Sequence, residues 1–244
     1  MVATLLMSGI TRAAETDTRC YELRIYSAAP GKLDALLSRF RDHTCALFER
    51  HGIANIGYWV PLDNQENKLI YLVAYPNREA REKSWKAFMA DPDWQAAWKA
   101  SEVNGKLVTK VENVFLSATD YSPAIEAMSH GPRVFEIRTY TASPGKLDAL
   151  NARFRDHTVA LFAKHGMTQI GYWNYMKDQK GADSTLWYVL AHKDREAAAR
   201  SFDAFRKDPA WISARSDSEK NGALTVRGGV KSEFTAATDF SPIR

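Results

Sequence analysis

The sequence predicts an α+β protein of two tandem ferredoxin-like βαββαβ domains that together form a dimeric α/β barrel. In that fold two antiparallel sheets face each other and the helices lie outside. Three observations lead to this prediction: an internal repeat over most of the chain, alternating polar and apolar residues at strand spacing, and apolar stripes at helical spacing. Each copy reads strand, helix, strand, strand, helix, strand, which is the order of the ferredoxin-like motif.

The repeat is carried by short motifs that recur in the same order in both halves of the chain. The strand pattern of residues 21–26 returns at 135–140, the Pro-Gly-Lys turn of 30–32 at 144–146, the Phe-Arg-Asp-His-Thr segment of 40–44 at 154–158, the Gly-Tyr-Trp segment of 57–59 at 171–173, and residues 115–123 at 234–242. Small insertions in the second copy fall around Gly181 and Gly228-Gly229. Because turns accept insertions and regular elements resist them, these glycines predict a hairpin and a bend near the last strand.

The repeat divides the chain into four parts. They are a leader at 1–18, a first domain at 19–122, a linker at 123–132 rich in Pro, Ser and Gly, and a second domain at 133–244. The leader has a short apolar stretch but no basic residues before it. If residues 1–14 are a truncated signal peptide, the protein is exported to the periplasm; otherwise the sequence favours the cytoplasm. No segment reaches the roughly 18 apolar residues that cross a membrane.

In the first copy we expect a strand at 20–27, a helix from Leu33 to His51 ended by Gly52, strands at 54–61 and 68–75, and a last strand at 107–117. Asn77 and Asp194 are predicted N-caps of the second helix in each copy. Asp91-Pro92 and Asp208-Pro209 then break that helix and start another.

The alternation in the first strand predicts two different faces. We expect Tyr21, Leu23 and Ile25 to face the helices of their own domain. Glu22, Arg24 and Tyr26 would then line the space between the two sheets, where buried charges need partners. The same assignment applies to residues 135–140 in the second copy.

Composition and missing motifs exclude several functions. The formal net charge is +4 and the pI about 9.0, but basic and acidic residues are interspersed, so no nucleic-acid partner is predicted. The sequence has no zinc-ligand spacing, glycine-rich phosphate loop, Rossmann fingerprint or serine nucleophile elbow, and no metal is predicted. Cys20 and Cys45 align with Val134 and Val159, which indicates that both behave as small hydrophobic residues.

The tandem motifs quoted above resemble the NIPSNAP family over residues 20–121 and 133–240. The resemblance implies a dimeric α/β-barrel fold. Family members in eukaryotes are associated with mitochondria and with vesicle transport or mitophagy signalling, whereas bacterial members are mostly without assigned chemistry. The fold is more distantly similar to cofactor-independent monooxygenases and haem-binding barrels, an analogy that does not transfer a function.

Candidate site residues follow from the helix stripe and the strands. His43 and His157 lie in the predicted apolar stripe of the first helix in each copy and are candidate catalytic bases, or else core histidines held by a backbone group. The candidate ligand-binding residues are Arg24, Tyr26, Tyr58, Trp59, Arg138, Tyr140, Tyr172 and Trp173, which could equally form an interface network and sheet packing. Trp85, Trp94, Trp98 and Trp211 are interpreted as helix packing or an oligomer surface.

Two functional hypotheses remain open. One is a small-molecule-binding barrel with cofactor-independent oxygenase-like or isomerase-like chemistry. The alternative is a non-enzymatic protein of protein–protein interaction or trafficking. We predict a homo-oligomer in either case. No cofactor is predicted: a histidine on an apolar helix face is compatible with haem, but no sequence feature indicates it.

Overall fold

The computed structural model describes residues 17–125, 127, 131 and 133–244. Eight strands close into one barrel in the order β1-β3-β2-β8-β5-β7-β6-β4, and every neighbouring pair is antiparallel. Residues 1–16 of the predicted leader and most of residues 126–132 of the predicted linker lie outside the described residues.

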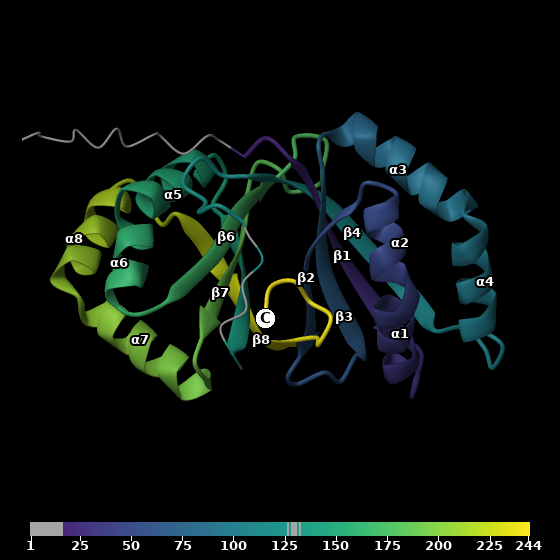
Figure 1. Ribbon diagram of the computed structural model, residues 1–244. Coiled ribbons are helices and arrows are strands. Elements are labelled where there is room, and N and C mark those ends of the chain that lie inside the picture. The colour runs from purple at the N-terminus through teal and green to yellow at the C-terminus, as the bar shows by residue number, and fades with distance from the viewer. Residues whose placement is uncertain (1–16, 126, 128–130, 132) are drawn as a thin grey trace, which may run out of the picture.

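The first repeat consists of β1 (Cys20–Ala28), α1 (Leu33–Arg39), the π-helical turn η1 (Phe40–Thr44), α2 (Cys45–Arg50), β2 (Ala54–Pro61), β3 (Lys68–Tyr75), α3 (Arg78–Ala90), α4 (Pro92–Ser101) and β4 (Val108–Ala118). The second repeat consists of β5 (Val134–Ala142), α5 (Leu147–Arg153), η2 (Phe154–Thr158), α6 (Val159–Lys164), β6 (Thr168–Tyr175), β7 (Thr185–His192), α7 (Arg195–Lys207), α8 (Pro209–Ser218) and β8 (Thr225–Ala237). Both follow the predicted order, and in Figure 1 the helices of each repeat lie outside its own four strands.

Two short seams join the repeats into one barrel. Residues 116–118 of β4 pair with residues 173–175 of β6, and residues 59–61 of β2 pair with residues 235–237 of β8. Within each repeat the pairing is much longer, for example from Cys20 to Ser27 between β1 and β3. The two sheets therefore meet at their edges only, and the space between them needs side chains to fill it.

Apolar side chains fill the barrel interior, and the predicted assignment of the two strand faces is wrong. Tyr21 and Leu23 belong to a buried cluster that draws Trp59, Phe135 and Trp187 from both repeats, so this face of β1 points inward. The polar face, residues 22, 24 and 26, lies under the helices of the same repeat. The physical reason is that a buried carboxylate needs hydrogen-bond partners: on the helix side Glu22 has Arg24 and Tyr75 of the sheet and Arg81 of α3, whereas the barrel interior is filled by apolar side chains.

The Gly-Tyr-Trp segment has a direct packing explanation. The Trp59 side chain faces the barrel interior and lies over Gly57, where a Cβ atom would stand 2.3 Å from the indole ring. Gly171 and Trp173 repeat this arrangement at the same 2.3 Å. Only glycine leaves room for the ring, so both residues of the motif are needed to fill the barrel.

The first helix of each repeat contains a π-helical turn that the sequence does not reveal. The backbone N–H of Cys45 donates to the Phe40 carbonyl, one residue further than in an α-helix. Each residue of such a turn rotates less about the axis, so Thr44 rather than His43 stays in line with the buried Phe40. His43 and His157 are exposed as a result, and the prediction that they lie on the apolar stripe is wrong.

The chain after the last strand of each repeat reaches across to the other repeat. Ser241 accepts a hydrogen bond from the backbone N–H of Tyr58 at 2.9 Å, and Phe240 packs on Phe40 with ring centroids 6.5 Å apart. Residues 119–122 make the equivalent contacts with Tyr172 and Phe154. We call residues 119–122 and 238–241 the reciprocal clasps, because each ties its own repeat to the opposite one.

The predicted helix breaks and caps are confirmed. Asn77 and Asp194 accept hydrogen bonds from the backbone N–H groups of residues 80 and 197, and Asp91 caps α4. The hydrogen bond from His51 and other donors lower the pKa of Asp91 to about 2. Among the described residues, no helix is both long and apolar enough to span a membrane.

Candidate functional site

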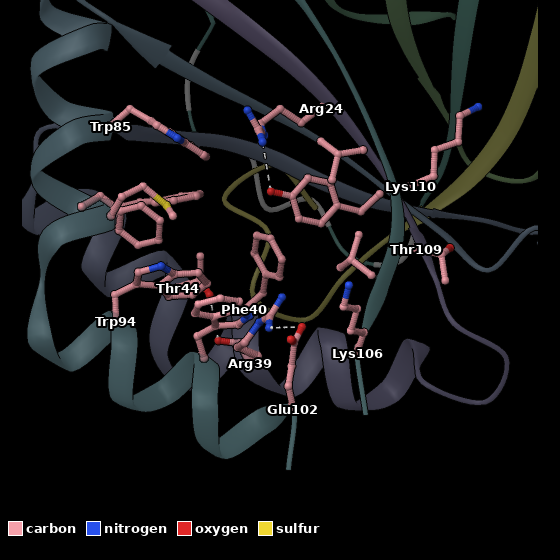
Figure 2. A pocket seen from close by; sticks show the side chains of 17 residues that line it. Arg24, Arg39, Phe40, Thr44, Trp85, Trp94, Glu102, Lys106, Thr109 and Lys110 are labelled. Carbon is pink, nitrogen blue, oxygen red and sulfur yellow. Dashed lines mark hydrogen bonds and ion pairs between the residues drawn. The ribbon is translucent and has the colours of Figure 1, made fainter. Parts of the chain in front are cut away.

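Each repeat has a cavity between the outer face of its sheet and its helices. The cavity of the first repeat measures about 410 Å³ and its counterpart in the second repeat about 290 Å³. The first is lined by aromatic side chains of α3, α4, η1 and α2 and by polar side chains of β1, β4 and α1. Figure 2 shows these side chains converging on one space. We call these spaces the first and second cavity.

A buried carboxylate and arginine form one end of the first cavity. Arg24 donates from Nη1 to Glu22 at 2.5 Å, from Nε to the Tyr71 hydroxyl at 2.9 Å and from Nη2 to the Tyr26 hydroxyl at 3.1 Å. Glu22 is fully buried and also accepts from Arg81 of α3 at 3.0 Å. Each nitrogen of Arg24 therefore donates to one neighbour, and both Arg24 and Tyr26 line the cavity.

The charges at this end are held ionised by one another. Burial alone would raise the pKa of Glu22, but Arg81 and Arg24 outweigh it and hold that pKa below its ordinary value. Burial would likewise lower the pKa of Arg24, but Tyr71, Tyr26 and Glu22 raise it. Burial raises the pKa of Tyr71 well above its ordinary value, so this phenol stays protonated and available as a hydrogen-bond partner.

The opposite end of the first cavity has donors without acceptors. Arg39 is 6% exposed and Trp94 is 9% exposed, and both line the cavity. Arg39 Nε and Trp94 Nε1 have no hydrogen-bond partner among the described residues. Arg39 Nη1 reaches Glu102 only at 3.4 Å, an interaction drawn in Figure 2 well away from Arg24. Buried N–H groups of this kind are normally paired, and both of these belong to residues that line the same cavity.

The second cavity repeats this frame with different partners. Arg138 donates to Glu136 and, at 2.8 Å, to the Tyr188 hydroxyl. Glu136 has His192 as its other partner, at 3.1 Å, in the position that Tyr75 has in the first repeat. Burial would raise the pKa of Glu136, but His192 and Arg138 hold it below its ordinary value. Arg153 binds Glu219 at 2.8 Å.

The structure brings together only part of the predicted site. Arg24 and Tyr26 line the first cavity, and Arg138 and Tyr140 line the second. Tyr58 and Tyr172 are buried against the helices, where they donate to Asn55 at 2.5 Å and to Gln169 at 2.7 Å. Trp59 and Trp173 belong to the barrel interior. The ligand-binding role of the eight residues stays a prediction.

The two predicted catalytic histidines lie away from both cavities. His43 lines a separate open groove with Asp42 and residues of α4, and His157 is exposed at the equivalent place. Among the described residues, no histidine lines the first cavity. The catalytic role of these histidines stays a prediction, and the groove at His43 is wide open and separate from both cavities.

Sequence reasoning missed several residues of the polar networks and of the cavities. Tyr71 and Tyr188 recur at the same place in the third strand of each repeat, a signal that could have found them. Arg39 and Arg153 also recur, but a buried arginine cannot be distinguished from a surface one by its spacing. Trp85, Trp94, Trp98 and Trp211, interpreted as packing or oligomer-surface residues, also line the cavities. The packing interpretation is confirmed for Trp85, Trp94 and Trp211, which lie in or against the buried clusters between helices and sheet.

The cysteines and possible metal ligands give no further site among the described residues. Burial raises the pKa of Cys20 and of Cys45 to about 11, in line with their expected behaviour as small apolar residues. Among the described residues, no group of three or more His, Cys, Asp or Glu side chains is arranged to hold a metal ion. A further cavity of about 320 Å³ opens into one side of the barrel, lined mainly by apolar residues such as Ile25 and Trp187.

Fold and site together define a closed antiparallel α/β barrel of two repeats, each with a polar network of Glu, Arg and Tyr under its helices. The NIPSNAP family profile matches residues 21–123 and 135–242, hence both repeats, and the chain belongs to the NIPSNAP family. The resemblance seen in the sequence motifs is thereby confirmed.

The chain is similar to proteins of known sequence and to proteins of known structure. A NipSnap homologue from Dictyostelium discoideum is 23% identical over 206 residues, which cover 83% of this chain and 82% of that protein. A candidate monooxygenase from Fusobacterium nucleatum is 8% identical with a TM-score of 0.61, covering 91% of this chain and 93% of its own. An anthrone oxidase-like protein is 14% identical with a TM-score of 0.55, covering 93% and 94%. These two structures show a shared fold alone.

Proposed function

We propose that this chain binds a small molecule with an aromatic body and an oxyanion or carbonyl oxygen, in the first cavity. The observation that carries the proposal is the pair of buried donors, Arg39 Nε and Trp94 Nε1, which have no acceptor among the described residues and belong to two residues that line an aromatic cavity of about 410 Å³. A cavity of this size, apolar with a few fixed polar groups, is the usual form of a small-molecule site.

The walls of the first cavity favour a flat apolar ligand. Phe88 lies between Phe48 and Trp94, with ring centroids 4.8 Å and 4.5 Å away, so the aromatic wall is continuous. Trp85 and Trp98 extend this wall towards the opening. Aromatic rings contribute about 0.5–1.5 kcal/mol per well-placed ring pair beyond the area that they bury.

The polar groups favour an oxygen at one end of that ligand. Arg39 carries a full positive charge in a buried place, and its interaction with Glu102 is long at 3.4 Å. An anionic or carbonyl oxygen of a ligand would give both Arg39 and Trp94 the acceptor that they lack. Removing such a penalty is worth about 1–3 kcal/mol for each buried donor.

If the protein is an enzyme, we propose that it carries out oxygenase-like chemistry on the ligand bound in the first cavity. A candidate monooxygenase and an anthrone oxidase-like protein share the fold, and the second description names an aromatic substrate class. Among the described residues that line the first cavity, Tyr26 supplies a phenol and Glu102 a carboxylate. We propose them as the groups that would exchange a proton with a bound ligand, in oxygenase-like or isomerase-like turnover alike.

Fluorescence titration with the aromatic sulfonate anilinonaphthalene sulfonate (ANS) tests binding in the first cavity. Trp98 is 44% exposed at the opening, so Trp98→Ala leaves the core intact. We expect Trp98→Ala to weaken ANS binding about tenfold, because it removes one ring of the wall. The matched control is Arg215→Ala, the equivalent position in the second repeat, which should leave the ANS affinity unchanged.

Two results would contradict the proposal: wild-type protein that leaves ANS fluorescence unchanged, or equal losses in the two variants. If ANS binds as expected, the same titration can be repeated with aromatic acids as competitors. Oxygen consumption in the presence of the tightest competitor then tests the enzymatic form, with Glu102→Gln as the variant that should keep binding and lose turnover.

A non-enzymatic role in protein–protein interaction or trafficking is the second candidate, and one surface favours it. Met89 and Trp98 are each 44% exposed and Val103 is 79% exposed, beside the opening of the first cavity. If this surface binds a protein instead of framing a ligand site, Val103→Ser should weaken capture of that partner and leave ANS binding unchanged.

A further inference from the structure

We propose that the second cavity is a separate binding site, specific for a compact aromatic ligand that carries a phosphate or another doubly negative group. The site lies in the other repeat from the one discussed above, and its ligand differs in charge and size. The inference therefore does not depend on what the first cavity binds.

The two cavities share one frame, so their differences can be compared position by position. Arg24 corresponds to Arg138, and Arg39 corresponds to Arg153. The register supports these equivalences, because Tyr26 pairs with Val111 in the first repeat just as Tyr140 pairs with Val230 in the second. The conserved frame fixes the buried end of each cavity and leaves the opening free to differ.

Two lysines already line the first cavity, whereas the exposed cations of the second cavity are arginines at two helix positions that are apolar in the first. Met89 near the end of α3 has Arg206 as its counterpart near the end of α7. Trp98 of α4 likewise has Arg215 as its counterpart in α8. All four side chains are exposed and line their cavities. Two positive charges thus replace a large apolar surface at equivalent places.

The inner part of the second cavity adds two more guanidinium groups. Arg138 and Arg153 line it, and Glu219 is its one lining carboxylate among the described residues. Arg153 is 6% exposed and its Nε has no hydrogen-bond partner among these residues. Glu136 pairs with Arg138, and Glu219 pairs with both Arg153 and Arg215, so four arginines against two carboxylates leave two positive charges in excess. The planar guanidinium group matches a phosphate in two-point contacts.

The aromatic walls and the small volume of the second cavity favour a small ligand with an aromatic ring. Phe205 lies between Phe162 and Trp211, with ring centroids 4.9 Å and 4.4 Å away, so a planar group has aromatic neighbours. The second cavity is smaller, at about 290 Å³ against 410 Å³, and Phe202 stands where the first repeat has Trp85. A single ring with a doubly negative group fits this combination better than a larger singly charged aromatic molecule.

Calorimetric titration of the full chain with phenyl phosphate at low salt tests the site. We expect wild-type protein to bind it with a Kd below about 1 mM. The double variant Arg206→Met with Arg215→Trp gives the second cavity the rim of the first, and we expect it to bind phenyl phosphate at least about tenfold more weakly. Binding should also weaken as salt is added, because exposed charges are screened.

The matched control is the double variant Met89→Ala with Trp98→Ala in the first repeat, which should bind phenyl phosphate like the wild type. Urea unfolding of both double variants checks that the exposed substitutions leave the fold intact. The proposal is overturned if wild-type protein fails to bind phenyl phosphate, or if the first-repeat variant loses as much affinity as the second-repeat variant. ANS binding, which reports on the first cavity, can succeed or fail independently of either result.

Discussion

Glu22 and Glu136 occupy the same position in the two repeats but depend on different partners. Glu22 accepts hydrogen bonds from Arg24 and Arg81, and from the Tyr75 hydroxyl at 3.2 Å. In the second repeat, Ala198 stands where Arg81 would be, so Glu136 has Arg138 and His192. A buried carboxylate is stable only while its partners remain, which makes the two arginines of β1 and β5 unequal in importance.

We therefore expect Arg138→Met to destabilise the protein more than Arg24→Met. Loss of one member of a buried ion pair costs about 3–5 kcal/mol when the other charge is left uncompensated. Glu136 would then keep only His192 at 3.1 Å, whereas Glu22 keeps the charged Arg81 at 3.0 Å, so the loss for Arg138→Met should lie nearer to that figure. Urea unfolding at neutral pH measures both variants, and equal losses would show that Arg81 does not compensate Glu22.

The π-helical turns decide which side of the first helix faces the cavity. Thr44 and Thr158 are buried, line the cavities and donate to the carbonyls of Arg39 and Arg153 at 3.1 Å. The neighbouring His43 is exposed. The turn thus brings a small hydroxyl residue, instead of an imidazole, to the wall of the cavity.

Substitutions of Thr44 and His43 test whether the π-helical turn sets the phase of the first helix. Thr44→Val removes a buried hydrogen bond and leaves the Arg39 carbonyl short of a partner, so we expect a loss of about 1–3 kcal/mol in the free energy of unfolding. His43→Ala changes an exposed side chain and should stay within about 0.5 kcal/mol of the wild type. A larger loss for His43→Ala than for Thr44→Val would mean that the helix phase is that of a regular α-helix.

At the scale of the whole molecule, the reciprocal clasps make the two repeats interdependent. The seams between the sheets are three residue pairs each, so the clasps add contacts where strand pairing is short. The backbone of Thr238 also donates to the Tyr58 carbonyl at 2.9 Å, and Asp239 forms an exposed ion pair with Arg41. The end of the second repeat thereby covers the first helix and second strand of the first. Self-association of the whole barrel stays a prediction.

Ser241→Ala should consequently loosen the first repeat, although Ser241 belongs to the second. The substitution leaves the buried Tyr58 N–H without its acceptor, and we expect a loss of about 1–3 kcal/mol in stability. Hydrogen exchange is expected to show faster exchange in β2 and little change in β6. Faster exchange confined to the second repeat would rule out the clasp as a link between repeats.

The sequence by itself determined the repeat, the order of the elements and most of their ends, because these depend on local periodicity, turns and caps. Asp91-Pro92 stops a helix wherever it occurs, and alternation in residues 21–26 makes a strand with two unlike faces. The sequence also placed Arg24 and Tyr26 among the candidates, since buried charge on a strand needs partners.

Only the tertiary structure decided which face of that strand points into the barrel. The choice rests on distant partners: Arg81 reaches Glu22 from α3, while Trp59 and Phe135 meet from opposite repeats inside the barrel. It also decided the phase of the first helix, because the π-helical turn is stabilised by what packs against Phe40 and Thr44. Local patterns show how polar and apolar residues alternate along a segment. Which face of that segment points into the barrel depends on burial against segments far away in the chain.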